Sequence, residues 1–410
     1  MPYSEIRISL VTPGHLASNP RIVKEADALH EAGFAVKVIA GDTNPGVRLL
    51  DDTISARAMW PVAKVGYNNR AHYLATRLRQ KFARTAFNRG VTGISAAIWA
   101  QSPLSGILSK AAAAEPADLY IGHNLAALPA VVAAARLHGA KIGFDAEDDH
   151  VGELVDTPEN KLEISIRKQI EAQFLPQCEH LTASSPSIAQ AYYERYGVTM
   201  IPILNVFPLA QQPLRPAPVD RKNDMLSVYW FSQTIGPGRG LEPFIQAMGI
   251  MRGHATLSIR GSDFLGYSSR LRALAEEAGV IEAVKFLPSA APDEMARLAA
   301  RHDVGFASEL NTPPNHKICL SNKIFTYLLA GIPILLSDTP AQRALAAQLG
   351  EAARLCDLMD PSSIVAALST WIDASALASA KREAWRLAKT RFNWDLEKDL
   401  FVQNVRQTLQ

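Results

Sequence analysis

The sequence predicts an α/β fold of two doubly wound domains, each a parallel sheet with helices on both faces. Two observations carry this prediction. Short apolar runs alternate with longer helical patterns along most of the 410 residues, which is the rhythm of parallel-sheet folds. The chain is also too long for one ordinary core of roughly 100–200 residues, and a proline-rich stretch over 205–225 separates its two rhythmic parts.

The expected elements follow from this rhythm. In the first part we expect a helix over 21–32 that ends at Gly33, and strands over 6–11, 35–40, 119–121 and 141–144. In the second part we expect helices over 270–278 and 293–300, and strands over 227–231, 256–260, 284–287, 304–307 and 334–337. We therefore divide the chain into a first domain over 1–206, a linker over 207–224, a second domain over 225–385 and a C-terminal helix over 386–410 that packs back across the domains.

The composition is that of an ordinary globular protein, with 48% hydrophobic and 20% charged residues. No apolar run approaches the roughly 20 residues that span a bilayer. The N-terminus leads into a strand pattern without the regions of a signal peptide, so we expect a cytoplasmic protein. Three widely spaced cysteines suggest neither a disulfide framework nor a zinc site.

The charge is unevenly distributed, because no acidic residue lies between Asp52 and Glu115. That stretch carries nine cations: Arg57, Lys64, Arg70, Arg77, Arg79, Lys81, Arg84, Arg89 and Lys110. Such a block indicates an anionic partner, which from charge alone is a lipid surface, a phosphate-bearing acceptor or nucleic acid.

Within this block, apolar residues recur at helical spacing from Arg70 to Arg89: Tyr73, Leu74, Leu78, Phe82 and Ala86. A basic amphipathic helix of this kind can lie on an anionic membrane. The alternative is an ordinary surface helix whose apolar stripe faces the core. We expect peripheral contact with the inner face of the membrane.

The clearest chemical signal opens the second domain. A strand is predicted to end at Ser232, a loop follows over 234–240, and a helix begins near Leu241. Glycines and free amides at a helix start form an anion site, and Arg239 adds a cationic fork suited to a diphosphate. The alternative is a plain glycine turn between strand and helix.

A second signal is the helix expected to start near Ser321. It would point Lys323 from its first turn toward the carboxyl ends of the strands, where open α/β sheets bind ligands, and lysine is a point charge for phosphate. The alternative is a solvated helix residue.

Taken together and in this order, these two segments resemble the nucleotide-sugar half of the retaining glycosyltransferases of family 4. The resemblance rests on Gly238-Arg239-Gly240 and on the Lys-x-x-x-Tyr-x-x-x-Gly-x-Pro pattern of Lys323 to Pro333. The N-terminal part is similar too, at Pro13-Gly14, at Asn19-Pro20-Arg21 and over 118–124. The resemblance spans nearly the whole chain and implies the GT-B architecture, two Rossmann-like domains facing across a deep cleft.

The resemblance also implies an activity: retaining transfer of a sugar from a nucleoside-diphosphate sugar to an acceptor hydroxyl. The acceptor would be a carbohydrate, a lipid-linked molecule or a small molecule, in bacterial surface polysaccharide, glycolipid or glycoconjugate synthesis. The nucleotide-sugar is a substrate, and we expect no cofactor, no metal and no nucleic-acid partner.

The site residues that the resemblance implies fall into three groups. The catalytic residues are His123, Arg239 and Lys323. The acceptor side has Arg21, Asp145 and Glu147. The donor-binding residues are Gly14, His15, Ser232, Gly236, Gly238, Gly240, Arg260, Leu287, Glu309, Ser321, Asn322 and Thr326.

The chain departs from the family pattern at Thr326, where the family usually has a glutamate that grips the donor ribose. Threonine can make one hydrogen bond there but no charged bidentate pair. A second family glutamate would fall at Ile318, and the nearest candidate is Glu309, beyond a longer loop. The donor's identity is therefore open.

Other functions stay open at this point. The acidic run over 145–150 offers potential metal ligands, but consecutive acids on a loop splay apart rather than converge on one ion. A nucleotide-sugar epimerase would have the same two-domain plan, and Thr326 favours a sugar-nucleotide-binding protein without activity. A dinucleotide oxidoreductase is disfavoured because no Gly-x-Gly-x-x-Gly follows the first strand.

Overall fold

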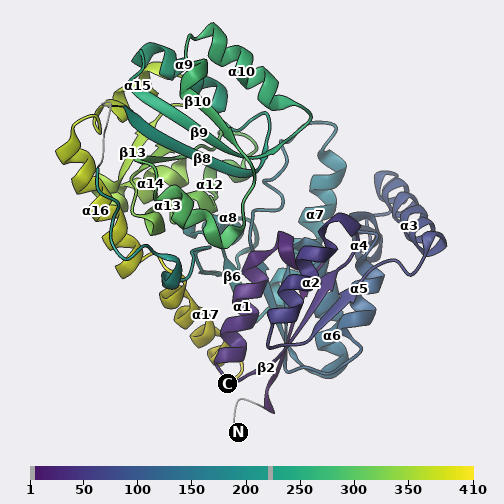
Figure 1. Cartoon of the computed structure of the whole chain (residues 1–410). Helices are drawn as coiled ribbons and strands as arrows, with labels where there is room; N and C mark the ends of the chain where they lie inside the picture. The colour runs from purple at the N-terminus through teal and green to yellow at the C-terminus, as the bar shows by residue number, and fades with distance from the viewer. Residues whose placement is uncertain (1–4, 220–224) are drawn as a thin grey trace. The chain divides into compact units, whose positions relative to one another are not determined.

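The computed structural model describes residues 5–219 and 225–410, which form two compact units (Figure 1). The first unit contains the chain up to Ile203 together with Lys398–Gln410, and the second contains Leu204–Glu397. Part of the predicted linker, 220–224, lies outside the described residues.

The first unit is built on a seven-stranded parallel sheet with the order β3-β2-β1-β4-β5-β6-β7. Its strands are β1 (Arg7–Thr12), β2 (Ala35–Gly41), β3 (Val62–Val65), β4 (Leu119–His123), β5 (Lys141–Ala146), β6 (His180–Ala183) and β7 (Ile201–Pro202). All five residues of β4 are buried, as expected for a central strand whose sheet is covered by helices on both faces.

The helices of this unit follow the strands in alternation. They are α1 (Pro20–Glu31), α2 (Arg48–Arg57), α3 (Arg70–Asn88), α4 (Ile94–Gln101), α5 (Ser105–Ala112), α6 (Leu128–His138), α7 (Lys161–Phe174) and α8 (Pro186–Tyr196). Helix α1 begins where the Asn19 side chain caps the amide of Ile22 at 3.1 Å. It ends before Gly33, whose φ of 93° places it in the region that favours glycine.

The second unit has a six-stranded parallel sheet with the order β10-β9-β8-β11-β12-β13. Its strands are β8 (Leu226–Ile235), β9 (Ala255–Asp263), β10 (Val284–Leu287), β11 (Val304–Ala307), β12 (Ile334–Ser337) and β13 (Ala353–Cys356). Its helices are α9 (Leu241–Met251), α10 (Tyr267–Glu277), α11 (Met295–Ala299), α12 (Asn315–Ile318), α13 (Asn322–Ala330), α14 (Pro340–Leu349), α15 (Pro361–Ser369) and α16 (Ala374–Thr390). Helix α17 (Trp394–Thr408) follows, and its residues from Lys398 on belong to the first unit.

The core of the second unit lies on both faces of this sheet. On one face Leu226, Val228 and Trp230 of β8 pack in a cluster of buried apolar residues that includes residues of α9, α10 and α15. On the other face the ring of Tyr327 in α13 lies directly against Gly305 of β11, which has no side chain to displace it.

Some expected elements differ from the structure. The C-terminal helix expected over 386–410 is instead two helices, because α16 ends at Thr390 and α17 starts at Trp394. The helix expected over 293–300 is a 3₁₀ turn, Pro292–Glu294, followed by the short α11. Strands β3, β6, β7 and β13 were not expected.

Among the described residues, no single helix has the length and apolar character needed to cross a bilayer. One pair, Pro361–Ser369 with Ala374–Thr408, meets the length and composition requirement together but is bent by 91°.

Substituting Gly305 tests the close packing of α13 on β11. A Cβ at this position would lie 2.2 Å from the Tyr327 ring, which is fully buried, so Gly305→Ala forces the helix away from the sheet. We expect a loss of about 1–3 kcal/mol, typical of overpacking, measured by chemical denaturation. The control is Gly236→Ala in the same unit, whose Cβ would make ordinary contacts with Phe264 at 3.7 Å. Equal stability of the two variants would contradict this account of the packing.

Candidate functional site

Both sheets reverse their strand order at the centre. In the first unit the chain builds outward from β1 to β2 and β3, and then crosses to β4 on the other side of β1. In the second unit β8 lies between β9 and β11 in the same way. Open parallel sheets bind ligands at the carboxyl ends of the strands where the order reverses. Each unit therefore has one candidate location, beyond β1 and β4 or beyond β8 and β11.

The glycine loop of the second unit begins later than expected. Strand β8 continues to Ile235, so the predicted strand end at Ser232 was wrong. The reason is that β9 pairs with it beyond an irregularity, joining Thr234 to Ser262 and Ile235 to Asp263. The connection to α9 is therefore only Gly236–Gly240, and Ser232 lies within the strand.

Two glycines shape this connection. Gly238 and Gly240 have φ of 71° and 69°, which favour glycine. A Cβ at Gly240 would lie 2.9 Å from Ser308 Cβ and 3.0 Å from Leu358 Cδ1. Gly240 is also the N-cap of α9, and no side chain caps that first turn. An uncapped helix start with closely approachable backbone suits an anion.

Arg239 is held in this loop through its backbone. Its carbonyl oxygen accepts a hydrogen bond from Ser308 Oγ, and Ser308 Oγ accepts one from Trp230 Nε1 at 3.2 Å. The Arg239 side chain is half-buried, and its guanidinium has no hydrogen bond or ion pair within the part of the chain that the structure describes. The backbone of Arg239 is thus held in place, while its guanidinium remains available for a bidentate contact with an anion.

Lys323 reaches the same strand end from α13. Its Nζ lies 3.3 Å from Ser321 Oγ, 3.7 Å from Glu309 Oε1 and 5.8 Å from the centre of the Trp230 ring. Glu309, which follows Ser308 directly, is the residue that contacts Lys323. The distance of 3.7 Å exceeds a direct hydrogen bond, which leaves the ammonium able to bind a further anion.

The predicted donor-binding residues Thr326 and Arg260 make hydrogen bonds within the second unit. Thr326 is buried, and its Oγ1 donates to the Asn322 carbonyl at 3.0 Å, within its own helix. Arg260 in β9 donates to Tyr229 Oη at 2.7 Å and to the Pro288 carbonyl, and Leu287 ends β10 beside it. No described contact joins Arg260 or Leu287 to Lys323.

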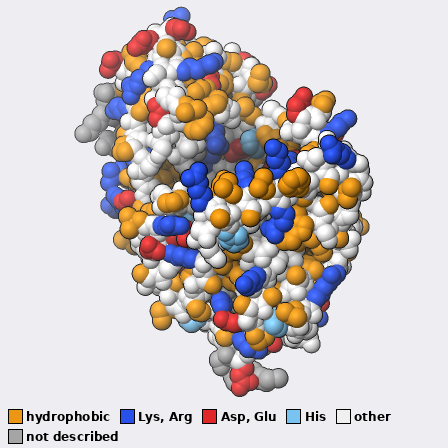
Figure 2. All heavy atoms as spheres, turned by 90° about the vertical axis from the view of Figure 1, so that its right-hand side faces the viewer, with side chains coloured by type: hydrophobic (Ala, Val, Ile, Leu, Met, Phe, Trp, Pro, Cys, Tyr) orange, Lys and Arg blue, Asp and Glu red, His pale blue; other side chains and the backbone are white. Residues whose placement is uncertain are grey.

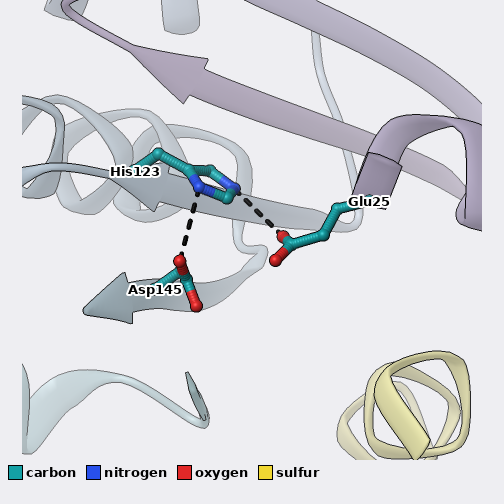
Figure 3. A group of neighbouring side chains, drawn as sticks. All are labelled: Glu25, His123 and Asp145. Atoms are coloured by element: carbon teal, nitrogen blue, oxygen red, sulfur yellow. Dashed lines mark ion pairs between the residues drawn. The ribbon is translucent and has the colours of Figure 1, made fainter. Parts of the chain in front are cut away.

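The corresponding location in the first unit holds a buried cluster of charges. His123 at the end of β4 lies between Glu25 of α1 and Asp145 of β5, and all three side chains are 0% exposed (Figure 3). His123 Nε2 is 3.1 Å from Glu25 Oε2, and Nδ1 is 3.6 Å from Asp145 Oδ2. Glu147, which is partly exposed, lies 3.4 Å from Nδ1.

Arg21 completes this cluster. Its guanidinium makes two hydrogen bonds of 2.7 Å to Asp145 and one of 2.7 Å to the Ile203 carbonyl. Thr182 Oγ1 donates to the same carboxylate at 2.5 Å. Arg21 and Asp145, both expected on the acceptor side, are thus interior and fully engaged. Of the three residues expected on the acceptor side, Glu147 is the one whose side chain is partly exposed.

Burial and neighbouring charges shift the pKa values of His123 and Asp145 in opposite directions. Burial would lower the pKa of His123, but the carboxylates of Glu25, Glu147 and Asp145 outweigh it and raise the pKa to about 10. Burial would raise the pKa of Asp145, but the Arg21 guanidinium lowers it, while burial raises the pKa of Glu25. The surrounding carboxylates therefore favour the imidazolium form of His123, and burial favours the protonated form of Glu25.

The ligand atoms of Glu25, His123 and Asp145 lie within 4.8 Å of one another, close enough for a metal ion. The residues do not fit one, however. Arg21 occupies both Asp145 oxygens, and its positive charge would repel a cation at this point. A proton on His123 suits the cluster better.

Both ring nitrogens of His15 make contacts within the first unit. Its Nδ1 lies 2.6 Å from Asp51 Oδ2, and its Nε2 accepts from the amides of Thr43 and Asn44 at 3.1 and 2.9 Å. Both ring nitrogens are used, so neither is free for a donor phosphate. Gly14 is tied similarly, since its carbonyl accepts from the Gly41 amide at 3.0 Å.

Comparisons with known proteins bear on the fold. No protein-family model matches the chain, and no curated protein sequence matches it. Solved structures do match over almost the full length. HepE of Anabaena, in complex with UDP-glucose, has a TM-score of 0.71 at 15% identity, covering 98% of this chain and 100% of its own. The chain has the GT-B fold.

Two further GT-B structures are similar. Sucrose-phosphate synthase from Thermosynechococcus elongatus has a TM-score of 0.69 at 14% identity, covering 98% of both chains. An α,α-trehalose-phosphate synthase (UDP-forming) from Burkholderia vietnamiensis has a TM-score of 0.65 at 16% identity, covering 98% of this chain and 100% of its own.

Three residues near the two candidate locations, Asn124, Glu25 and Ser308, were not identified from the sequence as site residues. Asn124 follows β4 with φ of 65° and ψ of 149°, a backbone conformation that few residues other than glycine adopt. Backbone outliers of this kind gather at functional sites. Glu25 and Ser308 were missed as well. The four-residue spacing from Arg21 was a signal for Glu25, but no sequence signal pointed to Ser308.

The His123 cluster predicts a pH dependence of stability. The unfolded pKa of histidine is about 6.5, and the folded pKa is about 10. Stabilisation from His123 is then fully present below the unfolded pKa and is lost as the pH rises through the folded pKa. Between these values the free energy of unfolding should fall for the wild type and change much less for His123→Asn, measured by denaturation at each pH.

His72→Asn, at a partly exposed histidine outside the cluster, serves as the control and should keep the wild-type slope. If His123→Asn does not fold, an NMR titration of the His123 ring in the wild type gives the same information. A ring that loses its proton near its unfolded pKa would contradict the account of the cluster.

Proposed function

We propose that this chain is a retaining glycosyltransferase of the family 4 type, which transfers a sugar from a nucleoside-diphosphate sugar to an acceptor hydroxyl. One observation carries the proposal: the end of β11 brings together the Arg239 loop, through Ser308, and Lys323, through Glu309. A loop that carries one cation, a helix that carries another and an uncapped helix start, all next to the end of β11, match the charge of a diphosphate. That HepE was crystallised with UDP-glucose supports the same donor class.

The chemical difficulty of such a transfer is the negative charge that builds on the departing diphosphate. Arg239, Lys323 and the amides at the start of α9 stabilise that charge, and each contributes on the order of a few kcal/mol to lowering the barrier. Glu309 keeps the Lys323 ammonium oriented when no donor is bound. With the charge neutralised in this way, the leaving phosphate helps to deprotonate the acceptor, and no metal or cofactor is required.

The acceptor is a carbohydrate, lipid-linked or small-molecule hydroxyl in bacterial surface polysaccharide, glycolipid or glycoconjugate synthesis. Within the first unit, Glu147 and Asn124 are the residues best placed to meet it. Glu147 keeps a partly exposed carboxylate that Asn19 Nδ2 holds at 2.5 Å. The buried His123 and Asp145 act as positioning residues that hold the ends of β4 and β5.

A second candidate is donor binding without transfer, favoured by Thr326. Its hydroxyl proton is committed to the Asn322 carbonyl, so it cannot replace a glutamate that accepts two ribose hydrogen bonds. A thermal-shift screen with UDP-, GDP-, ADP- and TDP-sugars identifies the donor, because a ligand of the folded state raises the melting temperature. A donor that is bound but neither transferred nor hydrolysed on long incubation supports this candidate, and conversion without acceptor identifies an epimerase.

Substitution of the two cations tests the diphosphate clamp. Arg239→Ala and Lys323→Ala should each reduce transfer from the identified donor by about 10²–10³-fold, as for the loss of one charge-stabilising group. The melting temperature without donor should stay near that of the wild type, while the donor-induced shift becomes smaller. Sugar transfer is measured with a labelled donor.

The matched controls are Arg270→Ala and Lys285→Ala, which remove exposed cations of the same unit and should leave transfer unchanged. Turnover close to normal in both Arg239→Ala and Lys323→Ala would remove the clamp and, with it, the proposed function.

A further inference from the structure

Helix α3 turns an apolar ridge toward the surface instead of the core. Leu74, Leu78 and Phe82 are 49%, 55% and 72% exposed, and their four-residue spacing places them on one face of the helix. The alternative of an ordinary surface helix, whose apolar stripe would face the core, is therefore not what the structure shows. The side that does face the protein carries Thr76 and Phe87, the two buried residues of the helix.

The ridge is held outward by contacts on the other side of the helix. The Arg79 guanidinium stacks 3.5 Å from the centre of the Trp99 ring in α4. Gln80 Nε2 donates to the carbonyls of Ala100 and Gln101 at 3.3 Å, and Arg84 pairs with Glu163 of α7 at 2.6 Å. These contacts fix the helix, so the ridge is a permanent feature of the surface.

Cations border the ridge. A hollow of about 690 Å³ beside α3 is lined by Leu74 and Leu78 and by four cations, Arg77, Lys81, Arg84 and Arg89. A second hollow of about 860 Å³ is lined by His72, Arg79 and Trp99 with Lys64 and Lys110. No acidic side chain lines either hollow among the described residues.

Figure 1 shows α3 at the edge of the first unit, beside α4. Figure 2 faces this side of the molecule, and it shows hydrophobic side chains gathered across the middle of the face with Lys and Arg side chains around them. Apolar side chains ringed by positive charge are the pattern of a helix that lies in the interface of an anionic bilayer.

We propose that α3 docks the protein on an anionic phospholipid bilayer. The ridge of Leu74, Leu78 and Phe82 enters the boundary between headgroups and acyl chains, and Arg77, Lys81 and Arg89 bind lipid phosphates. The two features together favour a bilayer over a soluble polyanion, because a nucleic acid would engage the cations and leave three large apolar side chains in water. The inference stands independently of sugar transfer.

The test is sedimentation of the full chain with vesicles of phosphatidylglycerol and phosphatidylcholine, compared with vesicles of phosphatidylcholine alone. The wild type should bind the anionic vesicles at least tenfold more strongly. Leu78→Gln with Phe82→Gln, and separately Arg77→Gln with Lys81→Gln, should each reduce that binding about tenfold or more. The control is Arg136→Gln with Leu137→Gln, which changes an exposed cation and an exposed apolar residue of α6.

Circular dichroism and an unchanged donor-induced thermal shift show that the variants are folded, so a failure of docking is distinguishable from a failure of the proposed function. Phe82→Trp gives a second measurement, since its fluorescence should be quenched by brominated phosphatidylglycerol. Equal vesicle binding by the wild type and the Leu78→Gln, Phe82→Gln variant would overturn the proposal. So would heparin binding as tight as vesicle binding and unaffected by these apolar substitutions.

Discussion

The end of β11 holds the proposed donor site together. Ser308 donates to the Arg239 carbonyl and accepts from the Trp230 indole, while the next residue, Glu309, contacts Lys323. Because Ser308 and Glu309 are consecutive, one strand end fixes both the glycine loop and the helix that carries the lysine. The position of β11 beside β8, where the strand order reverses, makes this convergence possible.

The charged residues at the two candidate locations are paired to different extents. In the first unit His123 and Arg21 are fully buried among carboxylates, as buried ions require. In the second unit Arg239 has no ionic partner among the described residues and Lys323 has only a loose one. A cation already satisfied gains little from a ligand, whereas an unsatisfied one gains most. This difference supports the proposed placement of the anionic substrate in the second unit.

Local patterns in the sequence predicted much of the fold, because short bounded apolar runs are read directly as strands: 284–287, 304–307 and 334–337 match the structure residue for residue. The end at Ser232 was wrong because β9, a partner distant in sequence, extends the ladder. The same limit applies to the site. His15 and Asp145 have the chemistry of ligand-facing residues, but their partners Asp51 and Arg21 lie far along the chain, and only the fold shows that these groups are already engaged.

The side chain of Thr326 determines how strongly the proposed site can bind the ribose of the donor, compared with its diphosphate. Its hydroxyl gives its proton to Asn322, which leaves lone pairs that accept at most a weak neutral hydrogen bond from a ribose hydroxyl. The carboxylate that contacts Lys323 comes instead from Glu309, two residues after the end of β11, so helix α13 contributes a cation but no anion. Hydrogen bonds to charged groups are roughly twice as strong as neutral ones. In the proposed site, recognition of the donor would therefore rest on its diphosphate more than on its ribose.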